Sequence, residues 1–349
     1  AIASKAGFAE WRHAVTVGVT PTAMTVRLSV HPVSDTVTVS AESSHAAMAS
    51  STVQPVSVIG REELMLRAVA VLSDAGDGSA GVQQSRTSPT LGGFFVRGLA
   101  GKNVAVYRDG VRYTNATQRG GISTFFNLLR PEGVEAVEVL RGPNSAQYGS
   151  DAVGGTVAVV SRSVTLGGNG ASRWHGQVVP VYQSATHGFG SQASVEYSGE
   201  RFGVYSDFAG HRANTLRTGE GIDSHAAVTR FLGLPSSVMG ERLPDTGFTA
   251  YGGTFHGQVR VGRGGQLSGH YERSQQDGGK RYDQLLGGDG NWIADLRNLM
   301  LDFGYLRYQA FAAGPFDRVA VTGSYNAQRE ERVNQGGQGN PNGAITHQY

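Results

Sequence analysis

Residues 134–162, VEAVEVLRGPNSAQYGSDAVGGTVAVVSR, contain two short apolar strands separated by a heavily punctuated turn. Pro143 fixes its own φ and has no N–H to donate, so it ends the first strand, while Gly142 permits a sharp exit. The turn also holds an aromatic anchor and three glycines that let the returning strand approach closely: Tyr148, Gly149, Gly154 and Gly155. The stretch therefore predicts a rigid strand-turn-strand unit.

Composition limits the class of protein to which the chain can belong. Glycine accounts for 51 of 349 residues, about twice the usual share, while charged residues make up only 17%. Many turns and alternating strands give such a mixture. The 30 basic and 28 acidic residues are spread along the chain, so no basic tract indicates nucleic-acid binding. The absence of cysteine excludes disulfides, thiolate metal sites and a cysteine nucleophile.

The sequence shows no pattern of catalytic or cofactor-binding residues. It lacks G-x-S-x-G, H-E-x-x-H and G-x-x-x-x-G-K-[ST], and no G-x-G-x-x-G follows a predicted strand. The ten histidines are scattered, and the aspartates of the glycine-rich loops lack the calcium-loop arrangement. We therefore expect no enzyme, no catalytic residues, no metal site and no cofactor.

The first half of the chain is predicted to form short strands and one helix. Residues 13–41 alternate with the period of a strand, and residues 42–52 have the composition of a linker. Arg108-Asp109-Gly110, between two apolar runs, is typical of a hairpin turn. Residues 61–75 place four apolar residues on one helical face: Leu64, Ala68, Val71 and Leu72. Together these elements predict a compact α+β domain of about 120 residues.

After Gly167 the alternation becomes more regular. One face of residues 248–261 holds Tyr251, Phe255, Val259 and Val261, and the other holds Thr254, His256, Gln258 and Arg260. Further along, Leu299, Leu301, Phe303 and Tyr305 share a face, and residues 318–329 alternate in the same way. An apolar face with aromatics opposite a polar face, in strands of about ten residues, is typical of a transmembrane β-barrel. A soluble antiparallel sheet is the alternative, because it also alternates.

The lengths of the connections distinguish these two alternatives. They are short at residues 199–201, 262–265 and 313–316, and long at 212–246 and 275–295. Outer-membrane barrels combine short periplasmic turns with long extracellular loops, so the barrel is favoured. About seven strands are expected between Arg173 and Arg329. Because a single-chain bacterial barrel needs an even number of strands and a closed edge, we expect the sequence to be part of a longer chain.

Three ordered segments resemble the TonB-dependent outer-membrane receptors, and the resemblance extends over nearly the whole chain. They are FFVRGL at 94–99, VAVYRDGVRYTN at 104–115, and the stretch at 134–162. The positions that carry it are Arg97, Gly98, Asp109, Gly110, Glu138, Arg141, Gly142, Pro143, Tyr148, Gly149, Gly154 and Gly155. Residues 129–132, LRPE, depart from the Asp-Pro of many members, and we interpret them as a local variation at a helix start.

The resemblance implies a mainly β protein with a small α+β part, in which an α+β plug domain precedes a partial antiparallel transmembrane β-barrel. Residues 1–34 would end a carboxypeptidase-regulatory-like β-sandwich, 35–52 would form the TonB box and linker, 53–165 the plug, and 166–349 the first barrel strands. The TonB box would comprise Asp35, Thr36, Val37, Thr38, Val39, Ser40 and Ala41, an extended segment that can add to another protein's sheet edge. Taken alone, this segment also fits an edge strand of the preceding domain.

The function implied by the resemblance is energy-coupled import across the outer membrane of a Gram-negative-type bacterium. TonB of the inner-membrane complex, outer-membrane lipid and a small extracellular ligand would be the partners. An iron-siderophore complex is the expected cargo, and heme, cobalamin, a glycan or a peptide are alternatives. Two other classes remain open: a passive porin or adhesin barrel, which needs no plug, and a soluble carbohydrate-binding β-protein, which folds without detergent.

Charged residues of the plug motifs suggest contacts with the barrel. Glu138 and Arg141 lie on a strand that the wall should cover, and buried charges persist only when they are paired. We predict that they form latches with each other or with barrel carboxylates, with Arg97 as a third candidate; ion pairs inside the plug are the equal alternative. Ligand contacts are expected from Arg112, Tyr113, Arg119 and the long outer loops.

Overall fold

The computed structural model describes residues 55–86, 88, 90–114, 125–166, 172–217, 246–262, 264–279, 291–313, 315–336 and 344–348, together with five two-residue strands elsewhere. Near the N-terminus, β1 (Ile2–Ala3) pairs with β2 (Trp11–Arg12), and β3 (Thr38–Val39) pairs with β4 (Ala47–Met48). Most of the expected sandwich end and TonB box therefore lies outside the described residues. Among those described, no helix is long and apolar enough to span a membrane.

The plug region is built on a five-stranded sheet with the strand order β5-β10-β11-β8-β9. Its strands are β5 (Val56–Gly60), β8 (Val104–Arg108), β9 (Val111–Arg112), β10 (Val134–Arg141) and β11 (Gly155–Ser161). A separate hairpin, β6 (Val82–Arg86) with β7 (Gly92–Val96), packs beside it. The helical elements are α1 (Arg61–Leu66), α2 (Ser145–Tyr148) and the 3₁₀ turns η2 (Leu72–Gly76), η3 (Gly101–Asn103), η4 (Phe126–Leu128) and η5 (Pro131–Gly133).

Both turns predicted from glycine positions are present. Asp109 and Gly110 have φ angles of 49° and 77°, and they join Arg108 to Val111 as paired residues of a tight hairpin. In the opening stretch, β10 pairs antiparallel with β11. A Cβ added to Gly155 would lie 2.7 Å from Val96 Cγ1 and closer still to the Leu140 carbonyl oxygen. The glycine therefore permits the close approach of the two strands.

The predicted helix is shorter than the sequence pattern suggested. Only Arg61–Leu66 is α-helical, and Ala68 adopts a left-handed φ of 47°, which ends the helix. Val71 and Leu72 are buried as expected, but Leu72 belongs to a separate 3₁₀ turn and Ala68 is exposed. The helical periodicity thus predicted the burial of Val71 and Leu72, but it did not predict that the helix ends before Ala68.

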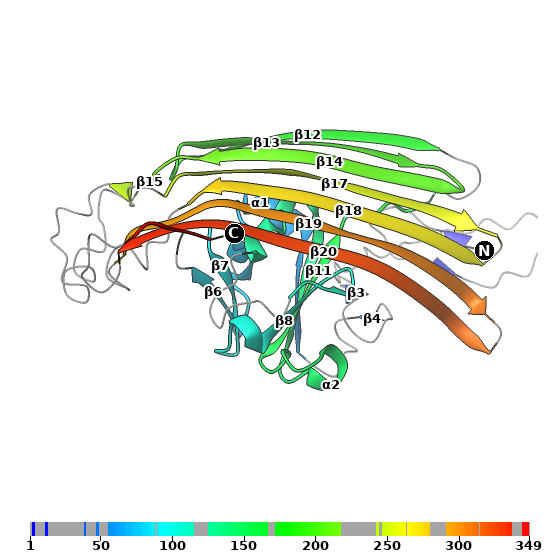
Figure 1. Ribbon diagram of the computed structural model, residues 1–349. Helices are drawn as coiled ribbons and strands as arrows, with labels where there is room; N and C mark the ends of the chain where they lie inside the picture. Colours follow the sequence, from blue (N-terminus) through cyan, green and yellow to red (C-terminus); the bar gives the residue numbers. More distant parts are fainter. Residues whose placement is uncertain are drawn as a thin grey trace, which may run out of the picture.

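The second region is an antiparallel wall that arches over the plug (Figure 1). Each strand pairs with the next in the chain: β12 (Arg173–Gln183), β13 (Gly188–Ser198), β14 (Phe202–Ala213), β17 (Phe248–Val261), β18 (Gly265–Gly278), β19 (Asn291–Ala313), β20 (Phe316–Gly336) and β21 (Thr346–Gln348). A small ribbon of β15 (Leu216–Arg217) and β16 (Arg242–Leu243) lies in the long β14–β17 connection. Seven long strands match the expectation, but they reach 23 residues in β19 rather than about ten.

Most of the wall is polar on its inner face and apolar on its outer face, as is typical of a membrane barrel. On β17, Phe255 is 50% exposed, whereas its neighbours Thr254 and His256 are 3% and 4% exposed and face the plug. On β19 the arrangement is reversed: Leu299, Leu301 and Phe303 face inward and join the hydrophobic core of the plug. The alternation therefore predicted correctly which residues share a face of each strand. On β19, however, the apolar residues Leu299, Leu301 and Phe303 face the plug instead of the outside.

The packing at Gly155 leads to a test of plug stability. We expect Gly155→Ala to lower the free energy of unfolding by about 1–3 kcal/mol, because the added Cβ overpacks the β10–β11 contact. Gly60→Ala is the matched control, since a Cβ there meets no atom within 4 Å. Chemical denaturation of the full-length protein, followed by limited proteolysis of the plug, would measure both. Equal stability of the two variants would contradict the packing argument.

Candidate functional site at the interface of plug and wall

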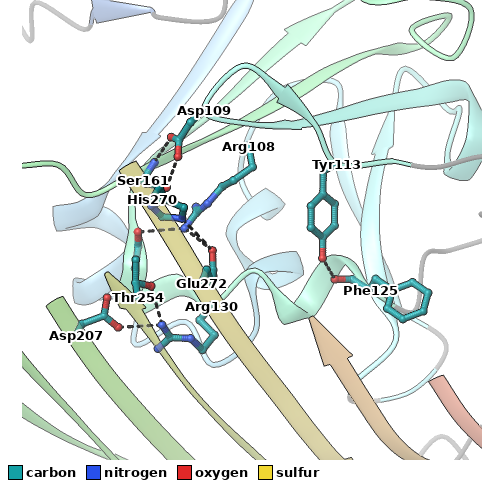
Figure 2. Close-up of polar contacts among 11 residues, drawn as sticks. Arg108, Asp109, Tyr113, Phe125, Arg130, Ser161, Asp207, Thr254, His270 and Glu272 are labelled. Atoms are coloured by element: carbon teal, nitrogen blue, oxygen red, sulfur yellow. Dashed lines mark hydrogen bonds and ion pairs between the residues drawn. The ribbon is translucent and has the colours of Figure 1, made fainter. Parts of the chain in front are cut away.

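Two buried ion pairs join the plug to the inner face of the wall (Figure 2). Arg108, the last residue of β8, places Nη2 2.9 Å from Glu272 Oε2 on β18, and neither side chain is exposed. Arg130 Nη2 lies 2.9 Å from Asp207 Oδ1 on β14 and donates to Thr254 Oγ1 on β17 at 2.9 Å. The pairs therefore connect one side of the plug to three wall strands.

The three wall partners lie in a single row across the sheet. Asp207 pairs in register with Thr254, and Thr254 pairs with Glu272. Because side chains alternate along a strand, residues in register on neighbouring strands point to the same face. The wall thus presents its two carboxylates at one level, directly opposite the two arginines.

Local backbone structure brings the arginines to this row. Arg130 precedes the 3₁₀ turn η5, whose Pro131 restricts Arg130 to an extended conformation. The same turn ends in Gly133, where a Cβ would lie 3.0 Å from Thr254 Oγ1, so the glycine allows the turn to approach the wall. The Gly133 carbonyl also accepts a hydrogen bond from Arg108 Nη2 at 3.4 Å. One short turn therefore contacts both arginine sites.

Electrostatics favours the charged state of these plug groups despite their burial. Burial alone lowers the pKa of Arg130, but Asp207 and the other nearby carboxylates outweigh it, so that pKa is raised above its ordinary value. Burial alone raises the pKa of Asp109, but Arg108, His270 and two hydrogen bonds from Ser161 hold that pKa below its ordinary value. Within the described part of the chain, no group of three or more histidine, aspartate or glutamate side chains could hold a metal ion.

Additional contacts extend the interface along the wall. Arg307 Nη2 on β19 donates to the Asp109 carbonyl at 2.6 Å. On β20, Asn326 and Gln328 both donate to the Tyr113 carbonyl, at 2.9 and 3.1 Å. The Tyr113 ring lies beside Phe303, with ring centroids 6.3 Å apart. The wall thus binds the backbone of Asp109 and Tyr113 through hydrogen bonds and the Tyr113 ring through an apolar contact.

The structure places the predicted latch residues within the plug. Glu138 is buried in β10, in register with Val58 of β5 and Ala158 of β11. Arg141 donates through Nη1 to the Ala80 carbonyl, and the Arg97 guanidinium lies beside Gly142. The plug-to-wall ion pairs found among the described residues use other arginines: Arg108, Arg130 and Arg162.

The predicted ligand contacts have different environments from one another. Tyr113 is 2% exposed, and its hydroxyl donates to the Phe125 carbonyl at 2.7 Å (Figure 2). Burial raises the pKa of Tyr113 well above its ordinary value. The Tyr113 side chain therefore lies in a packed interface rather than on a ligand-accessible surface. Arg112 pairs with Asp151 of the turn after α2, and Arg119 lies outside the described residues.

Removing one partner of a buried pair tests the interface. We expect Arg108→Met to destabilise plug docking by about 3–5 kcal/mol, because it leaves the Glu272 carboxylate buried without a cation. The double variant Arg108→Met/Glu272→Leu should recover most of this loss, since no charge is then buried. Limited proteolysis of the plug in the full-length protein, as a function of denaturant, would report docking.

A partly exposed plug ion pair supplies the control for this cycle. Arg86 lies 3.3 Å from Asp74, with side chains 39% and 26% exposed, so Arg86→Met should cost less than about 1 kcal/mol. If Arg108→Met were no more disruptive than Arg86→Met, the buried pair would have no role in holding the plug.

Comparison with known proteins was made for both the sequence and the fold. A family model for the TonB-dependent receptor plug domain matches residues 49–156. The vitamin B12 transporter BtuB of Vibrio cholerae is 31% identical over 117 residues, which cover 33% of this chain and 19% of that relative. The match therefore spans about a fifth of the relative's length.

Solved structures extend the similarity to the wall. A mutant of the ferric enterobactin receptor PfeA from Pseudomonas aeruginosa has a TM-score of 0.59 at 18% identity, covering 84% of this chain and 44% of that chain. The copper transporter OprC has a TM-score of 0.59 at 13% identity, covering 80% and 38%. At these identities the likeness shows the fold. The plug-domain match identifies residues 49–156 as the plug domain of a TonB-dependent receptor, and the fold shared with these structures extends over the wall as part of a β-barrel.

Proposed function

We propose that the chain is part of an outer-membrane transporter that imports a scarce small ligand by energy-coupled rearrangement of its plug. The observation that carries this proposal is the folded plug, attached to the polar inner face of the wall by the Arg108 and Arg130 ion pairs. A plug in this position obstructs the lumen of a barrel. Separating buried charges costs several kcal/mol, which favours an external source of work over thermal opening alone.

TonB is the proposed source of that work, and residues 35–41 are its proposed contact. The described part of this segment, Thr38–Val39, is extended and pairs with Ala47–Met48, as a segment suited to strand addition would. The chain then enters the plug at β5, an edge strand of the plug sheet. A pull on residues 35–41 would therefore reach the plug directly.

The proposed cargo is an iron-siderophore complex. One of the similar structures is named as a ferric enterobactin receptor, which supports this choice. Other similar proteins are named for vitamin B12 and copper, so the uptake test should include cobalamin, heme, glycans and peptides. Cargo and coupling are separate parts of the proposal and are measured separately.

Coupling can be tested with a proline in the TonB-contact segment. Val37→Pro should leave binding of a ferric siderophore unchanged and reduce its uptake to the level of cells treated with a proton-gradient uncoupler, because proline removes a donor from the extended segment. Ser43→Pro, in the following linker, is the control and should retain uptake. Labelled iron counted in cells expressing the full-length receptor gives both quantities.

The outcomes of this assay separate the alternatives. Uptake that persists after uncoupling would establish the passive-channel alternative. Energy-dependent uptake of another cargo from the panel would replace the siderophore while leaving the coupling mechanism intact.

Membrane insertion can be tested on the outer face of β19 and β20. Leu306 on β19 and Val319 on β20 are 58% and 40% exposed, and Val319 lies near the β19–β20 turn. We expect Leu306→Arg to lower the free energy of barrel folding in lipid by about 2–4 kcal/mol, and Val319→Arg by about 0–1 kcal/mol. Urea titration in lipid vesicles would measure both. Similar costs at the two positions would indicate that this face does not cross a bilayer.

A further inference from the structure

The inner face of the wall carries a row of ring side chains that the transport proposal does not use. Its members pair in register across β14, β17, β18 and β19: Tyr205, His256, His270 and Tyr305. Each of the four is at most 9% exposed. The row lies two residues along each strand from the row of wall carboxylates, and because side chains alternate it faces the plug as that row does.

The two histidines are held by packing against neighbouring rings. The His256 and His270 rings have centroids 6.1 Å apart, and the Tyr305 ring stacks on His270 at 5.3 Å. Phe303 meets His270 edge-on at 6.0 Å. Among the described residues, none of the four ring nitrogens has a hydrogen-bond partner. A proton arriving at either imidazole would therefore displace no hydrogen bond.

His270 shares a carboxylate with the plug. Its Nε2 lies 3.8 Å from Glu272 Oε2, the oxygen that Arg108 Nη2 contacts at 2.9 Å (Figure 2). All three side chains are fully buried. A charged His270 would therefore compete with Arg108 for Glu272.

Charged groups of the plug and the wall surround the two imidazoles. Among the described residues they are Arg108 and Asp109 of the plug, Glu272 on β18 and Arg307 on β19. On the β14 side, Arg162 of the plug lies 4.4 Å over the Tyr205 ring and 3.8 Å from Glu196. The guanidinium groups are thus matched in number by carboxylates, so a proton on either imidazole adds an unmatched positive charge.

Docking of the plug makes this additional charge costly. A docked plug removes water from the row and places Arg108 against Glu272, so a charged imidazole has neither solvent nor a free carboxylate. When the plug moves away, water returns and Glu272 can bind a charged His270 on its own strand. The undocked state therefore takes up a proton more readily than the docked state, and by linkage acid favours undocking.

We propose that His256 and His270 form a proton-sensitive site that loosens the plug from the wall when the medium becomes acidic. The pair takes up one proton from water, and Glu272 exchanges the Arg108 guanidinium for the His270 imidazolium. Histidine suits this role because its charge changes between about pH 5 and 8. The inference rests on the proposed role of the docked plug in closing the lumen, but not on the cargo or on TonB.

The pH dependence of docking in the purified full-length receptor tests the proposal. Spin labels on Gln147→Cys in the plug and Glu200→Cys in the β13–β14 turn, both exposed positions, report the docked fraction along a urea titration. Between about pH 7.5 and about pH 5.5, the equilibrium constant for docking should fall about tenfold or more. Uptake of one full proton allows about a hundredfold over this range. His256→Gln/His270→Gln should remove most of the difference, because glutamine stays neutral.

Arg108→Met gives a prediction of the opposite sign. It leaves Glu272 buried without the plug cation, and a charged His270 then supplies the missing charge in the docked state. Acidification should therefore strengthen docking of this variant. Arg108→Met/His270→Gln should recover less, since the imidazole is gone. A loss on acidification equal to that of the parent would contradict the exchange of partners at Glu272.

Two exposed histidines supply the matched control. His175 lies on β12, and His187 lies in the turn that follows β12, with Nδ1 2.9 Å from the Tyr182 hydroxyl. His175→Gln/His187→Gln also removes two imidazoles and should keep the full pH difference. A heat-dependent shift in gel mobility would verify that each variant is folded, and His270→Gln alone serves if the His256/His270 variant is not.

Three further results would overturn the proposal. They are docking of the parent that is equal at the two pH values, a pH difference retained by a folded His256/His270 variant, and loss of that difference in the His175/His187 control. Because neither cargo nor TonB is present, such failures leave the transport proposal intact. Uptake that persists after uncoupling would contradict the transport proposal whatever the pH dependence of docking.

Discussion

Charge buried between the plug and the wall must be paired, and this constraint fixes how the two parts fit together. Arg108 and Arg130 meet Glu272 and Asp207 on one row of the wall, and both sides of each pair are almost fully buried. A shift of one residue in the register of either strand would turn its carboxylate to the outer face. The position of the plug along the wall is therefore determined by a few atoms.

Different strands of the wall provide the apolar contact with the plug and the polar contacts that fix its position. On β19, Leu299, Leu301 and Phe303 are fully buried and continue the hydrophobic core of the plug. On β14, β17 and β18, the inward-facing polar groups of Asp207, Thr254 and Glu272 bind specific plug atoms. Apolar burial is non-directional, so it supplies contact without fixing a position. The polar contacts of β14, β17 and β18 therefore fix the position of the plug, which the apolar contact of β19 does not.

Much of the fold could be predicted from local sequence, because turns and alternation obey local rules. The Asp109-Gly110 hairpin and the β10–β11 unit follow from glycine and proline positions alone. Alternation shows which residues share a face, but not which face is turned inward, so β19 required the structure. The helix prediction was too long because periodicity does not reveal the left-handed break at Ala68.

The interface was harder to predict, since its partners are distant in the chain. Arg130 lies in LRPE, the one segment that departs from the family pattern, and its partner Asp207 is 77 residues away. Matching them requires the register of β14, β17 and β18 across a long connection. The signal in the sequence was a carboxylate at a buried position of an alternating strand, which also occurs at Glu272.

The hydrogen bonding of the Arg108–Glu272 pair is incomplete. Arg108 Nε and Nη1 and Glu272 Oε1 have no hydrogen-bond partner within the described residues. Replacing a buried ion pair by apolar residues of the same size is often neutral or stabilising, so the pair need not hold the plug more firmly than an apolar contact would. What the ion pairs add is a defined docked position, because a displaced plug would leave charges buried without partners. Such an interface therefore defines where the plug docks on the wall.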